Sequence, residues 1–132
     1  MPGFRVPVIS LSDQDFEQLV LQAVESLPTS FRRLLKDVVI DIEPMPDRAT
    51  ARSMGLRSRR RLLGLFHGVP LTKQSVMDNP RLANRITIYR ENIRRICRRR
   101  HEIVEQVRKT VLHEIGHHFG LEETDLDELG YG

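Results

Sequence analysis

Two histidines four residues apart, His113 and His117, constrain this chain more than any other feature of its sequence. On a helical wheel His117 lies about 40° from His113, and Glu114 lies about 100° from it. The apolar residues of the same stretch fall at about 160–240°, on the opposite side of the wheel. They are Val104, Val111, Ile115 and Phe119. The pattern therefore predicts a helix with one face on a core and both imidazoles, with the carboxylate beside them, on the other face.

Two neutral imidazoles and a neighbouring carboxylate in this spacing are typical of a catalytic zinc site. His113 and His117 would be metal ligands, and Glu114 would be the general base that activates a water molecule. The alternative is a surface histidine pair beside a solvent-exposed carboxylate. We favour zinc because the ligand spacing, the adjacent Glu114 and the helix-terminating Gly120 coincide. His118 falls at about 140°, toward the apolar side, which predicts a core or supporting histidine rather than a ligand.

The size and composition of the chain indicate one globular domain spanning residues 1–132. A chain of 132 residues with 39% hydrophobic and 30% charged residues can bury one modest core. No apolar run reaches the length of a membrane span, and the N-terminus lacks the apolar stretch of a secretory signal, so we expect no membrane partner. The lone cysteine, Cys97, excludes an intramolecular disulfide and is expected to be a half-buried structural thiol. We therefore expect a cytoplasmic protein.

The net charge of +3 conceals a strong asymmetry. Residues 113–132 contain six acidic and no basic side chains, so the rest of the chain, with 21 basic and 12 acidic residues, carries +9. Arginines gather in two runs, one over residues 57–61 and one made of Arg90, Arg94, Arg95, Arg98, Arg99 and Arg100. Such runs can bind phosphates, cover a solvated surface or pair with the acidic tail. We favour a solvated surface over nucleic-acid binding because no aromatic residues are interleaved for base stacking.

Periodicity and capping residues predict an α+β fold. The expected helices are residues 13–27 after the start signal at Ser12, a short helix at 29–35, a short helix capped by Asn92, and a long helix from about 101 to 118. The expected strands are residues 38–43, 62–66 and 85–90. Residues 47–57 show no clear period and are expected to form a loop. Three strands between helices indicate a small sheet packed with helices rather than repeated βαβ units.

With these motifs the chain resembles the small bacterial "minimal" zincin-like metallopeptidases, whose pattern is H-E-x-x-H-x-x-G-x-x-D. The specific part of the resemblance is residues 113–120, and softer similarity covers residues 63–72 and 86–90. It implies a small zincin-like fold, a roughly three-stranded sheet packed with helices, in which the C-terminal helix carries the motif and one strand borders the active-site cleft. We expect that edge strand, where an extended peptide substrate could pair, to consist of Ile86, Thr87, Ile88 and Tyr89.

Two departures from the family pattern affect the expected site. The acidic residue three positions after Gly120 is Glu123 rather than Asp, so Glu123 is the expected third zinc ligand and Asp125 is its alternative. The chain also lacks the methionine turn below the metal, because all four methionines precede the motif and only twelve residues follow Gly120. The cleft is therefore expected to be open, or to be completed by a partner or by a second copy.

The sequence predicts a zinc metallopeptidase, an endopeptidase of weak or narrow activity. Its zinc would be held by His113, His117 and Glu123, and Glu114 would activate water for hydrolysis of a peptide or protein substrate. Two other classes stay open. One is a catalytically idle zinc-binding interaction protein, and the other is an arginine-rich nucleic-acid-associated protein.

Overall fold

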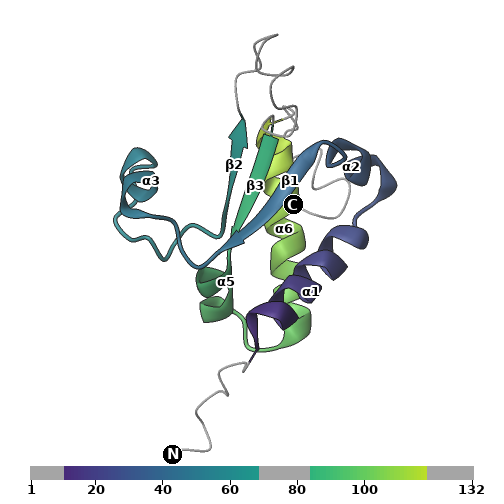
Figure 1. Ribbon diagram of the computed structural model, residues 1–132, viewed down its shortest axis with the longest axis horizontal. Helices are drawn as coiled ribbons and strands as arrows, with labels where there is room; N and C mark the ends of the chain where they lie inside the picture. The colour runs from purple at the N-terminus through teal and green to yellow at the C-terminus, as the bar shows by residue number, and fades with distance from the viewer. Residues whose placement is uncertain (1–10, 69–83, 119–132) are drawn as a thin grey trace, which may run out of the picture.

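The computed structural model describes residues 11–68 and 84–118, which form a three-stranded sheet and five helices (Figure 1). In chain order the elements are α1 (Asp13–Glu25), α2 (Thr29–Leu34), β1 (Val38–Glu43), α3 (Arg48–Ser53), β2 (Gly64–Gly68), β3 (Asn84–Tyr89), α5 (Arg90–Ile96) and α6 (Arg100–His118). Helices and a small mixed sheet make this an α+β fold, as expected.

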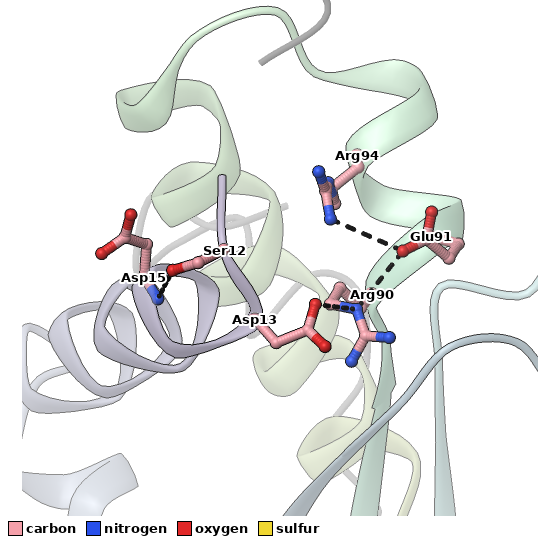
Figure 2. Close-up of polar contacts among 6 residues, drawn as sticks. All are labelled: Ser12, Asp13, Asp15, Arg90, Glu91 and Arg94. Carbon is pink, nitrogen blue, oxygen red and sulfur yellow. Dashed lines mark hydrogen bonds and ion pairs between the residues drawn. The ribbon is translucent and has the colours of Figure 1, made fainter. Parts of the chain in front are cut away.

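Helix α1 begins and ends where its local sequence indicates. The Ser12 hydroxyl accepts a hydrogen bond of 3.0 Å from the Asp15 N–H, so it caps the helix (Figure 2). The helix stops before Pro28, which cannot donate a backbone hydrogen bond. Its buried residues, spaced for one helical face, are Phe16, Leu19, Val20 and Ala23. This apolar face packs against α6.

The sheet has the strand order β1-β3-β2, with β1 parallel and β2 antiparallel to β3. The expectation that Ile86–Tyr89 forms the edge strand is therefore wrong. Strand β3 lies in the centre, and Ile86, Thr87, Ile88 and Tyr89 are all buried. A central strand has no free backbone groups for a peptide to pair with, because both of its edges already form ladders. Among residues 11–68 and 84–118, the two edge strands are β1 and β2.

One face of the sheet packs against α1 and α6 to form the core. Ile40 of β1 is opposite Ile86 of β3, which is in turn opposite Phe66 of β2, so the three side chains lie in one row across the sheet. Helix α6 covers this row with residues that are completely buried. They are Ile103, Val107, Val111, Leu112 and Ile115. The amphipathic helix predicted from the sequence is thus confirmed, and its polar face carries the histidines.

Two local expectations are wrong. Part of the segment expected to be a loop forms helix α3, which begins because the Asp47 carboxylate accepts a hydrogen bond of 2.6 Å from the Thr50 N–H. Asn92 does not cap a helix: it lies inside α5, fully buried, and its amide donates to the carbonyl oxygens of Arg59 and Leu62. It therefore anchors the chain that leads into β2.

Arginines of the second run form ion pairs that join α5 and α6 to α1. The Arg90 guanidinium lies 3.2 Å from Asp13 and 3.3 Å from Glu91, and Arg94 lies 3.6 Å from Glu91 (Figure 2). Arg100, at the start of α6, lies 3.8 Å from Asp15. Three arginines of this run thus have carboxylate partners within the fold.

Cys97 lies buried at the end of α5, as expected for a structural thiol. Burial, together with the nearby charge of Glu102, raises the pKa of the thiol to about 11. At neutral pH the thiol therefore stays protonated and weakly nucleophilic. Among the described helices, none is both long and apolar enough to cross a bilayer.

Candidate active site

The histidines of the motif lie on the exposed face of α6, one turn apart. The His113 and His117 rings have centroids 4.3 Å apart and planes inclined at 56°, and their Nε2 atoms are separated by 3.0 Å. Both side chains are exposed, whereas Ile115 between them is fully buried. The helix therefore presents two imidazole nitrogens, side by side, toward solvent.

The separation of these nitrogens fits a shared metal ion. Two imidazole nitrogens bound to one tetrahedral zinc at their usual distances lie about 3.3 Å apart. The observed 3.0 Å differs from this value by a few tenths of an ångström, which a small ring rotation can supply. Within residues 11–68 and 84–118, no three His, Cys, Asp or Glu side chains form a metal cluster. Both candidates for a third ligand, Glu123 and Asp125, lie outside the described residues, as does Gly120.

Glu114 contacts the edge of the sheet directly. Its Oε2 accepts a hydrogen bond of 3.1 Å from the backbone N–H of Phe66 in β2. The ladder explains why this N–H is available. The bond from Tyr89 N–H to Leu63 O shows that Gly64 and Ile88 face each other without exchanging hydrogen bonds. Phe66 and Ile86 occupy the same type of position two residues along, so the Phe66 N–H points away from β3.

His118 also contacts β2, although it does not lie in the core. Its ring stacks on the ring of Phe66, with centroids 3.9 Å apart and planes inclined at 22°. The side chain is exposed, so the expectation of a core histidine is wrong. A Cβ atom at Gly68 would lie 3.7 Å from His118 Cε1 and 3.4 Å from the Phe66 ring. Phe66 thus joins β2 to the end of α6 through both its side chain and its backbone.

The close approach of α6 to β2 depends on Gly64. A Cβ atom at this position would lie 2.5 Å from the Thr110 methyl group and 3.2 Å from the Thr87 carbonyl oxygen. Thr110 itself is buried and is held by a hydrogen bond of 2.8 Å from its hydroxyl to the Gln106 carbonyl oxygen. Because residue 64 has no side chain, the strand can lie close enough for Glu114 to reach its edge.

Phe66 is the site residue that the sequence did not indicate. The signal that could have found it is the pair of glycines, Gly64 and Gly68, on either side of it in the strand. Glycines at alternate positions of a strand mark a face where another element approaches closely. The side chain of residue 66 lies on that face, where it can contact the motif helix.

Tyr89, at the end of β3, is influenced by the charge of Glu114. Burial raises the pKa of its phenol to about 12, and the carboxylates of Glu43, Asp47 and Glu114 add to the shift. The phenol therefore remains neutral throughout the physiological range. Tyr89 is buried, so β3, the strand that the sequence predicted to pair with the substrate, contributes no exposed tyrosine to the candidate site.

A known protein family matches most of the chain. The zincin-like metallopeptidase family matches residues 35–132, which include β1, the whole of the sheet and the motif helix. No curated protein matches the chain.

Proposed function

The chain belongs to the zincin-like metallopeptidase family, and on this premise we propose that it is a zinc-dependent endopeptidase. The observation that carries the proposal is the paired geometry of His113 and His117, whose Nε2 atoms lie 3.0 Å apart on an exposed helix face. The third ligand is Glu123, with Asp125 as the alternative. Zinc, when bound, lowers the pKa of water and polarises the substrate carbonyl group.

Glu114 is the general base in this proposal. A hydrogen bond from Phe66 N–H to Oε2 keeps one carboxylate oxygen at the border between α6 and β2. The other oxygen, Oε1, accepts the proton of the attacking water and then returns it to the nitrogen of the leaving amine. With Oε2 held by the strand, Oε1 can accept and then donate the proton without any reorientation of the carboxylate between the two transfers.

The free edge of β2 is the proposed docking position for the substrate, in place of the buried Ile86–Tyr89. An extended peptide can add to this edge through backbone hydrogen bonds. Glu114 already accepts from the Phe66 N–H, so the peptide pairs with the other outward-facing backbone groups of β2 and lies beside the general base. A peptide paired here would therefore run past the general base and along the exposed histidines.

A catalytically idle zinc-binding protein is the second candidate, and one contact favours it. The bond between Glu114 and Phe66 could serve only to fasten α6 to the sheet. In that case Glu114 would stabilise the fold and would take no part in hydrolysis.

The deciding experiment compares the wild-type protein with Glu114→Gln, which keeps the size of the side chain and can still accept from Phe66 N–H. Both proteins should bind about one zinc per chain, because a base is not a ligand. Cleavage of a diverse library of extended peptides should occur only with the wild type, should stop with a chelator and should return with zinc. If the zinc-loaded wild type cleaves nothing, the idle candidate replaces the peptidase. Equal cleavage by Glu114→Gln would remove the assigned base.

A further inference from the structure

Helix α3 and the chain after it form a pocket lined by arginines. The pocket has a volume of about 360 Å³, and its lining residues are Arg48, Ala51, Arg52, Leu56, Arg57 and Arg59. None of the described residues that line it is acidic, and its apolar members are the buried Ala51 and the half-buried Leu56. The pocket is therefore a concave, positively charged surface with a small apolar floor.

Unlike Arg90, Arg94 and Arg100, the arginines of this pocket form no ion pair among the described residues, although the charge of Arg59 contributes to lowering the pKa of Asp47. In residues 11–68 and 84–118, ion pairs are formed by Arg85, Arg90, Arg94, Arg100 and Arg108, and by none of the four pocket arginines. Arg48 and Arg52 lie four residues apart on α3, a spacing at which like charges repel. An anion in the pocket would relieve that repulsion.

The backbone around the pocket is held by several hydrogen bonds. The Asp47 cap fixes the start of α3, and Gly55, with a φ of 69°, ends it while Leu56 N–H bonds to the Ala51 carbonyl oxygen. Arg59 Nε donates to the Pro46 carbonyl oxygen at 2.8 Å, so this guanidinium is positioned before any ligand arrives. The buried Asn92 amide holds the Arg59 carbonyl oxygen, also at 2.8 Å. The pocket is thus organised by the fold.

The pocket lies on the same side of the sheet as the free edge of β2. In Figure 1, α3 lies beyond β2, whereas α1 and α2 lie on the side of β1. Arg59 precedes Gly64, the first residue of β2, by only five positions. An extended chain that leaves the β2 edge at its Gly64 end therefore runs toward the arginines.

We propose that the α3 pocket recognises an acidic side chain of the peptide substrate, a few residues to the C-terminal side of the cleaved bond. The proposal rests on the proposed peptidase function and names its substrate class as acidic peptides. Antiparallel pairing is the more stable arrangement on a strand edge, and it directs the C-terminal part of the peptide toward Gly64 and the pocket. A Glu or Asp carboxylate there forms charge-assisted hydrogen bonds with the guanidinium groups.

Binding to the zinc-loaded Glu114→Gln protein tests this, because that variant holds the peptide without cleaving it. The probes are an extended fluorescent peptide with Glu residues in its C-terminal third and the same peptide with Gln at those positions. The Glu peptide should bind about tenfold more tightly, and Arg48→Gln with Arg52→Gln should abolish the difference. Equal affinity of the two peptides for the unaltered pocket would overturn the proposal.

The matched control is Arg60→Gln with Arg61→Gln, which removes the same charge from neighbouring exposed positions outside the pocket. It should keep the preference for the Glu peptide. If the control variant loses as much of this preference as the pocket variant does, the preference comes from the general positive charge and not from the pocket, and the proposal fails. Binding of a single-stranded DNA oligonucleotide is measured as well. The pocket would be assigned to nucleic acid instead if the oligonucleotide bound more tightly than the Glu peptide, lost affinity in the pocket variant and lost affinity steeply with rising salt concentration.

Cleavage is measured separately with the wild-type protein and both peptides. Absence of cleavage together with arginine-dependent binding would refute the peptidase function and leave an acidic-peptide binding site. Cleavage of both peptides at equal rates and affinities would support the peptidase and refute the pocket.

Discussion

At the scale of single residues, Glu114 connects the chemistry of the candidate site to the sheet. Its carboxylate accepts from a strand N–H that the ladder leaves free, and it follows directly after the first histidine of the pair. Proton transfer by a carboxylate depends on holding it within hydrogen-bond reach of the reacting water. Here that position is set by one backbone contact between α6 and β2.

The third zinc ligand can be identified by substitution. Glu123→Ala should weaken zinc binding by roughly tens of fold, and Asp125→Ala should weaken it much less, because Glu123 occupies the position of the acidic residue in the family pattern. Zinc affinity is measured by competition with a chromogenic chelator. A larger loss in Asp125→Ala would make Asp125 the ligand and would show that the family spacing does not hold in this chain.

The buried phenol of Tyr89 should make stability sensitive to alkaline pH. Its pKa in the folded protein is about 12, against an ordinary value of 10.0, so between these values the native state keeps a proton that the unfolded chain has released. Its stabilising contribution is complete below pH 10 and is lost as pH rises toward 12. Tyr89→Phe should therefore lose less stability than the wild type between pH 9 and about 11.5, as measured by urea midpoints. If both proteins lose stability equally over this pH range, the raised pKa of Tyr89 is contradicted.

At the scale of elements, the border between α6 and β2 decides whether Glu114 can reach Phe66. The helix lies close to the strand because Gly64 has no side chain opposite the Thr110 methyl group. The Phe66 ring on His118 closes the same border one turn further along. Small changes in this spacing should therefore affect both stability and the position of the general base.

Gly64→Ala should destabilise the protein by about 1–3 kcal/mol, because the new methyl group overlaps Thr110. Adding Thr110→Ser removes that methyl group and keeps the hydroxyl that bonds to Gln106, so it should restore part of the loss. The two substitutions should show a coupling of about 1 kcal/mol in a double-mutant cycle of unfolding free energies. Additive effects would mean that the predicted overlap does not determine the cost.

At the scale of the whole molecule, the arginines fall into two groups with different surroundings. Arg90 and Arg100 join α5 and α6 to α1 through their ion pairs, and Arg94 pairs with Glu91 within α5. The arginines around α3 form no such ion pair among the residues described, although Arg59 helps to lower the pKa of Asp47. One part of the positive charge therefore supports the fold, and the other is available to a ligand.

Zinc should stabilise the whole domain, since it would fasten the end of α6 to the residues that follow it. A ligand present at a thousand times its dissociation constant adds about 4 kcal/mol to the folded state. For a chain of this size that corresponds to a rise in Tm on the order of 15 °C. The increase, measured by thermal unfolding with and without zinc, should disappear in His113→Ala and in His117→Ala. A full increase in the double histidine variant would place the stabilising metal elsewhere.

The sequence by itself determined the elements whose signals are local. The 3.6-residue period of α6, the Ser12 cap of α1 and the β-branched run of β1 depend only on neighbouring residues, and all three elements were predicted within a few positions. The exposure of His113 and His117 follows from the same period, because a helix with one apolar stripe must turn its other face to solvent. For α3 the period was absent in so short a helix, and the only local signal was its Asp47 cap.

The tertiary structure alone decided which strand is the edge and what contacts the motif. Alternation of side chains is the same for a central and an edge strand, so the pattern of Ile86–Tyr89 could not show that β1 and β2 pair on either side of it. The contact of Glu114 with Phe66 joins residues 48 positions apart, and the stack of His118 on Phe66 spans 52. Such contacts depend on how closely a helix approaches a strand, which is set by packing across the whole core and not by the local sequence of either element.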